Sequence, residues 1–298
     1  MMVFMSVACG AGTSFEQHVG AYWLAQLLVR GIPPVLIDTV VTEVNFQTER
    51  LGWQTDDFLV VSTRTGGGPQ RLAGQVKRTF TVSAADDECK KAVGDFWTDF
   101  KNARCFSPED DRFVLVVLRG TNVLLEHFVG LLDCARASRD GAEFEQRLAT
   151  TGFVSGKAVH YCGELRNIIG GIEGQCVTAA DIWSFLRVLH VLSLDLHNST
   201  RQTEAHIKSL LAYTVTEGDA VAGARASWNE LVAVASVAMA EARTLRHGDL
   251  PATLRARHTS ISINEQRVLR ALKDHTAITL RGIRATIGPA LHQQRAAR

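Results

Sequence analysis

The sequence has no apolar run long enough to cross a lipid bilayer. Its most apolar late stretch, residues 231–240, falls far short of the roughly 20 residues that a spanning helix needs. The first twelve residues carry neither a positively charged start nor a sustained apolar segment, so they are not typical of a signal peptide. These two absences predict a cytoplasmic protein.

Neither sign of charge dominates, because 32 lysines and arginines face 31 aspartates and glutamates, for a formal net charge of +1. This balance excludes a uniformly basic surface, so any DNA contact must come from a local patch. Six cysteines are scattered without a CxxC pair, a spacing that suits neither a zinc site nor a disulfide framework. The Walker A motif GxxxxGK[ST] is also missing; the nearest string, residues 152–158 (GFVSGKA), is one residue short and ends in alanine.

The first half of the chain has the pattern of an α/β domain. Apolar residues at helical spacing predict a helix over residues 13–30 and another over 86–101. Between them lie strand signals at residues 40–46, 57–62 and 72–80, and a continuous apolar run follows at residues 112–118. The order α-β-β-β-α-β predicts a small mixed sheet with helices on both sides.

The second half reads as helices only. We expect them at residues 123–137, 143–149, 180–196, 204–213, 219–245 and 264–272, with no convincing strand pair. A boundary near Lys157 divides the chain into residues 1–157, an α/β domain, and residues 158–298, an all-helical domain for regulation or oligomerisation. The basic bias of the last fifty residues fits a solvated helical face as well as a DNA patch.

Polar residues in the first half could form a metal-dependent hydrolytic site. Gln75 and Lys77 are two residues apart on the third strand, so their side chains leave the same face. Asp57 (with Asp56 as the close alternative) opens the neighbouring antiparallel strand, which brings it near Gln75. Glu16 lies in the opening helix. Carboxylate and amide oxygens suit a hard cation such as Mg²⁺, and a lysine beside them can offset charge growing on a phosphate.

Each of these residues also has a purely structural interpretation. Glu16 follows Thr13 by three residues, so it could be a ligand or could only complete a T-x-x-E capping box. The adjacent aspartates Asp56 and Asp57 could be solvated loop acids. Lys77 could line an exposed sheet face; if it points inward instead, it needs a carboxylate partner, because a buried unpaired charge is costly.

Four segments together resemble a known family of nucleases: FEQHVGAYWLAQLL, VNFQTERLGWQTDDFLVV, LAGQVKRTFTVS and FWTDFKNA. They are similar to the effector endonucleases of bacterial antiphage systems, the Mrr-like and CBASS-effector members of the PD-(D/E)xK superfamily, as at the N-termini of Avs-type STAND NTPases. The resemblance implies a restriction-endonuclease-like sheet. It also implies a catalytic site of Glu16, Asp57, Gln75 and Lys77, with the first three as ligands of Mg²⁺ (or Mn²⁺). Gln75 stands where the superfamily's name has Asp or Glu, which shifts the charge of metal binding onto Glu16 and Asp57.

The expected function is therefore that of a Mg²⁺-dependent endonuclease cutting double-stranded DNA in antiphage defence, activated by assembly as a homo-oligomer or by a STAND-type partner. One alternative is a nuclease-like module that binds DNA or protein and cuts nothing, and another is an RNase or single-strand nuclease, which the same site could serve. Phosphate contacts are expected near the site, from Arg78, Lys90, Lys91, Lys101 and Arg104.

Overall fold

The computed structural model describes residues 7–36, 38–64, 66–118, 121, 123–196 and 202–261, with side chains from Ser14 onward. The helix expected at residues 264–272 lies outside the described residues. Among the residues that are described, no helix has the length and apolar character to cross a membrane.

The helices and strands follow one another along the chain in an α-β-β-β-α-β order, then mostly as helices. The first part comprises α1 (Val7–Val29), β1 (Val40–Phe46), the 3₁₀ helix η1 (Thr48–Leu51), β2 (Phe58–Thr63), β3 (Pro69–Lys77), α2 (Asp87–Lys101) and β4 (Arg112–Val117). The second part comprises the π-helical η2 (Leu124–Phe128), α3 (Val129–Ala137), α4 (Gly141–Ala149), α5 (Gly156–Glu173), α6 (Ala179–Leu186), β5 (Leu189–Ser193), α7 (Gln202–Thr214), α8 (Ala220–Ala240), β6 (Thr244–Arg246), η3 (His247–Asp249) and α9 (Ala252–Arg257).

Six strands form one mixed sheet in the order β5-β4-β3-β2-β1-β6. Strands β1, β2 and β3 form an antiparallel meander, whereas β3, β4 and β5 run parallel. Strand β6 pairs antiparallel with the other side of β1. The expected α/β class with a mixed central sheet and flanking helices is confirmed.

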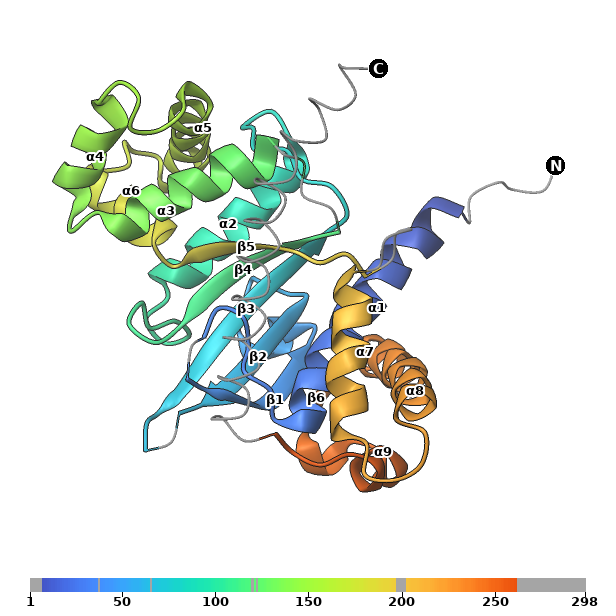
Figure 1. Cartoon of the computed structure of the whole chain (residues 1–298). Coiled ribbons are helices and arrows are strands. Elements are labelled where there is room, and N and C mark those ends of the chain that lie inside the picture. The colour runs from blue at the N-terminus through green and yellow to red at the C-terminus, as the bar shows by residue number, and fades with distance from the viewer. Residues whose placement is uncertain are drawn as a thin grey trace, which may run out of the picture.

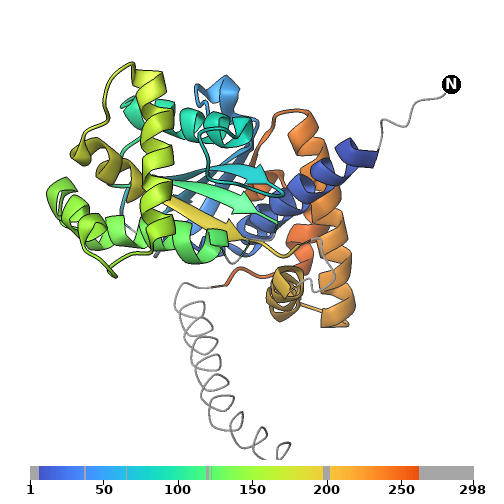
Figure 2. The same cartoon turned by 90° about the horizontal axis from the view of Figure 1, so that it is seen from above.

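Helices cover both faces of the sheet (Figures 1 and 2). On one face α1, α7 and α8 pack against side chains such as Phe58, Val60 and Val114. On the other face α2, α3, α5 and α6 pack against Leu59, Phe113 and Leu115. Neighbouring residues of a strand thus enter opposite cores, as the two-residue repeat of a strand requires. Both cores contain residues from each side of Lys157.

The expectation that residues 158–298 are all helical is wrong in two places. Residues 180–196 do not form one helix: α6 ends at Leu186, and Leu189–Ser193 pairs with β4 as an edge strand. Similarly, α8 ends at Ala240 and Thr244–Arg246 pairs with β1. Short apolar runs fit helix and strand alike, so the available strand edge decides their structure.

Helix α5 was not predicted at all. Its four glycines (Gly156, Gly163, Gly170 and Gly171) lower its helix propensity. The helix forms because one of its faces is buried against α2 and α3, including Leu165 and Ile169, and because the Ser155 side chain caps its start by accepting from the Ala158 N–H.

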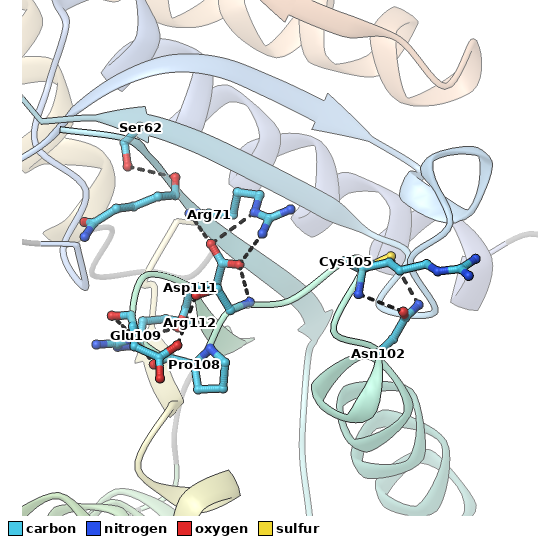
Figure 3. A network of polar contacts seen from close by, with 11 residues as sticks. Ser62, Arg71, Asn102, Cys105, Pro108, Glu109, Asp111 and Arg112 are labelled. Atoms are coloured by element: carbon cyan, nitrogen blue, oxygen red, sulfur yellow. Dashed lines mark hydrogen bonds and ion pairs between the residues drawn. The ribbon is translucent and has the colours of Figure 1, made fainter.

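A buried carboxylate ties the beginnings of β3 and β4 together (Figure 3). Asp111, only 1% exposed, accepts hydrogen bonds from the Arg71 backbone N–H (3.0 Å), Nε (3.1 Å) and Nη2 (2.6 Å). The Ser107 N–H donates to Asp111 Oδ2, the oxygen that also accepts from Arg71 Nη2, at 2.8 Å. The guanidinium of Arg71 also lies 5.5 Å from the ring centre of Trp53. A paired buried charge of this kind fixes the register of the parallel strands.

We expect Asp111→Ala to lower the free energy of unfolding by about 2–3 kcal/mol. Breaking a fully buried pair costs roughly 3–5 kcal/mol, and the effect here is smaller because the Arg71 side chain is 30% exposed. Urea denaturation measures the change, with the exposed neighbour Asp110→Ala as the control. Equal stability of the two variants would contradict the role given to Asp111.

Candidate active site

The ends of β2 and β3 place Asp57 beside Gln75. Phe58 pairs with Gly74 in the antiparallel ladder, so the residue before Phe58 lies next to the residue after Gly74. At this point the Val76 N–H donates to Asp57 Oδ2 at 2.6 Å. The prediction that the start of one strand brings a carboxylate to the end of its neighbour is confirmed.

Gly74 keeps this junction in place. A Cβ atom at Gly74 would lie 2.0 Å from Cζ of Phe58, because the Phe58 ring crosses the strand there. Phe58 is 2% exposed and its ring centre is 5.4 Å from that of Trp23 on α1. The glycine therefore leaves room for the buried ring of Phe58, the residue that directly follows Asp57.

The loop that leads into Asp57 is held by helix α2. Asp99, 1% exposed, accepts hydrogen bonds from the Gln54 N–H (2.8 Å) and the Thr55 N–H (2.7 Å) with its two carboxylate oxygens. The Thr48 N–H donates to the Asp56 carbonyl oxygen at 2.9 Å. The approach to β2 is thus fixed from both sides.

Gln75 is buried and only half of its amide is paired. Its side chain, on a residue that is 1% exposed, donates through Nε2 to Asp95 Oδ2 at 2.7 Å. Its Oε1 is buried and has no hydrogen-bond partner. A buried polar atom without a partner costs about 1–3 kcal/mol, so it needs a specific explanation.

Lys77 lies on the same face of β3 as Gln75 and points toward α2. Its Nζ is 2.5 Å from Glu88 Oε2, and its side chain is 20% exposed. Lys77 thus has a carboxylate partner, and the contact between them is exposed rather than buried. The partner is Glu88, which the sequence had not indicated.

Glu16 is not a capping residue. Helix α1 begins at Val7, nine residues earlier, so the interpretation of Thr13 and Glu16 as a capping box is wrong. Burial raises the pKa of Glu16. The positive charge of Lys77 lowers this pKa, and the negative charge of Asp56 raises it, but burial has the largest effect. Glu16 therefore lies close enough to the strand ends to interact with their charges.

Asp57 carries the most perturbed carboxylate of this group. Burial raises the pKa of Asp57, the hydrogen bond from the Val76 N–H lowers it, and the charges of Asp56 and Glu16 add to the rise, so that the pKa is about 7. Asp56 differs in environment, because its side chain is 46% exposed and lies 3.7 Å from Lys91 Nζ. A poorly solvated carboxylate near other acids is a frequent feature of functional sites.

The oxygen atoms that could hold a cation are mixed in kind. Within the part of the chain that the structure describes, no group of three His, Cys, Asp or Glu side chains is arranged to hold a metal ion. The charge of Glu16 acts on Asp57, and the β2–β3 register sets Asp57 beside Gln75, whose buried Oε1 has no hydrogen-bond partner. An amide oxygen is an acceptable ligand for hard cations.

Sequence reasoning missed three acidic residues of α2: Glu88, Asp95 and Asp99. They bind Lys77, Gln75 and the loop before Asp57 respectively. Together with Lys91 they recur at helical spacing (residues 88, 91, 95 and 99), which places them on one face of the helix. Such a stripe usually faces solvent, so it gives no signal until the strand beneath it is known.

The basic residues expected to contact phosphate are partly engaged with α2 and α6 acids. Lys91 Nζ is 2.6 Å from Asp95, Lys90 Nζ is 2.6 Å from Asp87, and Lys101 Nζ is 3.7 Å from Asp181. Arg78 and Arg104 are exposed.

Comparisons with known proteins found only distant likenesses. No protein-family model and no curated protein matches the sequence. Among solved structures, the Moraxella osloensis Cap4 SAVED/CARF-domain containing receptor aligns with a TM-score of 0.41 and 14% identity over 76% of this chain. The Acinetobacter baumannii Cap4 receptor, in complex with the cyclic trinucleotide 3'3'3'-cAAA, aligns with a TM-score of 0.41 and 11% identity over 84% of this chain. This chain spans 44% of the length of each receptor.

Ionisation of the buried Asp57 carboxyl should lower the free energy of unfolding at alkaline pH. Its pKa is 3.8 when unperturbed and about 7 in the folded protein, so its contribution to stability is present below pH 3.8 and is lost as the pH rises through 7. We expect Asp57→Asn to raise the Tm of the metal-free protein at pH 8 by a few degrees, since ~1 kcal/mol shifts Tm by about 2–4 °C in a protein of this size. The gain should shrink at pH 5. Calorimetry in EDTA at both pH values measures it, and an unchanged Tm at pH 8 argues against a buried charge.

Proposed function

We propose that this chain is a metal-dependent DNA endonuclease with a restriction-endonuclease-like core of the PD-(D/E)xK type. The observation that carries the proposal is the buried, unpartnered Oε1 of Gln75 beside Asp57, with Lys77 on the same strand face. The α-β-β-β-α-β order of α1 to β4 and the mixed sheet are consistent with it.

Three residues would hold the cation: Glu16, Asp57 and Gln75. They fit because Gln75 Oε1 lacks any other partner, and because Glu16 and Asp57 are acids whose pKa values burial raises. Neighbouring carboxylates repel each other when both ionise, so a cation between them would relieve that repulsion. When bound, a divalent cation polarises a phosphoryl oxygen and lowers the pKa of a bound water.

Lys77 would stabilise the negative charge that grows on the phosphate during hydrolysis. Its ammonium is held at the end of β3 by Glu88, whose side chain is 68% exposed. An exposed partner contributes little to the stability of such a pair, so a phosphate can compete for the lysine. Asp57 also makes the site sensitive to pH, because its carboxylate is ionised mainly above pH 7.

Double-stranded DNA is the proposed substrate and antiphage defence the proposed setting. Both rest on the resemblance of the four segments around the site residues to effector nucleases. The net charge of +1 gives the chain little intrinsic attraction to DNA. We therefore propose that it acts after assembly, either as a homo-oligomer or on a STAND-type or sensor partner.

We expect the protein to cut plasmid DNA with Mg²⁺ or Mn²⁺ and to stop in EDTA. Lys77→Ala should lower the cleavage rate at least a hundredfold because it removes charge stabilisation in the transition state. The Tm should change little, since the Glu88 partner is exposed. The matched control is Lys157→Ala, which removes an exposed lysine of α5 that is not among the expected phosphate contacts.

Two outcomes separate the alternatives. Cleavage that persists in the presence of EDTA contradicts the metal-dependent mechanism. DNA binding without cleavage in every metal, by the wild type and by a forced tetramer, favours a nuclease-like module that binds and does not cut.

A further inference from the structure

The carboxylate of Asp95 lies one hydrogen bond away from the proposed ligand Gln75. Asp95 Oδ2 accepts from Gln75 Nε2 at 2.7 Å and from Lys91 Nζ at 2.6 Å. The Asp95 side chain is 19% exposed, and Gln75 is 1% exposed. The contact thus joins strand β3 to helix α2 in a largely buried position.

This contact settles which end of the Gln75 amide is free. A primary amide has a donating NH₂ end and an accepting oxygen end. If the amide flipped, its oxygen would face the Asp95 carboxylate, and two acceptors at hydrogen-bond distance repel. The NH₂ end therefore faces Asp95 and the oxygen end is left buried without a partner.

The contact also places a negative charge behind a neutral ligand. Gln75 carries no charge, whereas Asp95 is an acid whose hydrogen bond to the amide NH₂ increases the negative partial charge on the amide oxygen. Lys91 balances Asp95 on its outer side, with Nζ also 3.7 Å from Asp56. A single hydrogen bond thus joins the neutral amide of Gln75 to the carboxylate of Asp95.

We propose that Asp95 is a positioning residue that presents the Gln75 oxygen to the cation and supplies the negative charge that Gln75 lacks. This inference rests on the proposed function. It predicts that Gln75→Glu impairs the site, although this change restores the acid that the superfamily's name has at this position. A Glu at position 75 would face Asp95 across one hydrogen-bond distance, and the repulsion between the two carboxylates would disturb the site.

The two residues can be exchanged to test the claim. In the double variant Gln75→Glu with Asp95→Asn, the asparagine NH₂ donates to the glutamate, so the hydrogen bond is kept with its direction reversed. The net charge of the pair is also unchanged. A residue needed only for packing would give no such reciprocal rescue.

The experiment compares the wild-type chain, Gln75→Glu, Asp95→Asn and the double variant. Mn²⁺ binding is titrated at pH 8 without DNA, and Tm is measured on the same samples in EDTA. We expect each single variant to bind Mn²⁺ at least tenfold more weakly than the wild type and to melt at a lower temperature. The double variant should recover Mn²⁺ affinity to within about threefold, and its Tm should rise above that of both single variants.

Asp87→Asn is the matched control, because Asp87 is an acid of the same helix whose side chain is 94% exposed. It should leave both readouts unchanged. If the wild type binds Mn²⁺ and Asp95→Asn or Gln75→Glu binds equally well, the inference is wrong and the proposed function stands. If the wild type does not bind Mn²⁺, the proposed cation site fails, and with it the role given to Asp95.

Discussion

The candidate site depends on one hydrogen bond at the end of a strand pair, from the Val76 N–H to the Asp57 carboxylate. The ladder between β2 and β3 has already ended at Phe58 and Gly74, so this side chain continues the pairing in place of the backbone. The bond also favours the ionised carboxyl, although burial outweighs it and raises the pKa of Asp57 to about 7. The same contact therefore fixes where the acid lies and keeps it able to lose its proton near neutral pH.

Helix α2 is the second constraint, because its acids contact three separate parts of the site. Asp99 holds the backbone before Asp57, Asp95 holds the Gln75 amide, and Glu88 pairs with Lys77. Each contact decreases the freedom of a side chain or loop that would otherwise have several conformations. A site whose geometry is set before a ligand arrives needs less reorganisation to use it.

The strands that carry the site residues could be predicted from local sequence, whereas the outer strands β5 and β6 could not. Strand β1 was predicted at its observed bounds, and Arg112–Val117 was recognised as a strand buried on both faces. The position of Asp57 beside Gln75 followed from antiparallel strand pairing, and the shared face of Gln75 and Lys77 followed from strand periodicity. Leu189–Ser193 and Thr244–Arg246 were assigned to helices because only the free sheet edges make them strands. Asp95 was missed because its role depends on the packing of α2 against β3, and only the length of α1 removes the capping alternative for Glu16.

The outermost strands have a consequence for how the chain folds. Strand β6 pairs Arg246 with Glu43, so β1 finds its second neighbour only about two hundred residues later in the sequence. Strand β5 likewise reaches β4 after α3, α4, α5 and α6 have been made. Contacts so distant in sequence close slowly, because the loop entropy is lost before the pairing is gained. During synthesis on the ribosome the outer edge of β4 therefore remains unpaired until Ser193 has emerged, and that of β1 until Arg246 has emerged. The unpaired edges of such a nascent chain are surfaces where chaperones or other copies can bind.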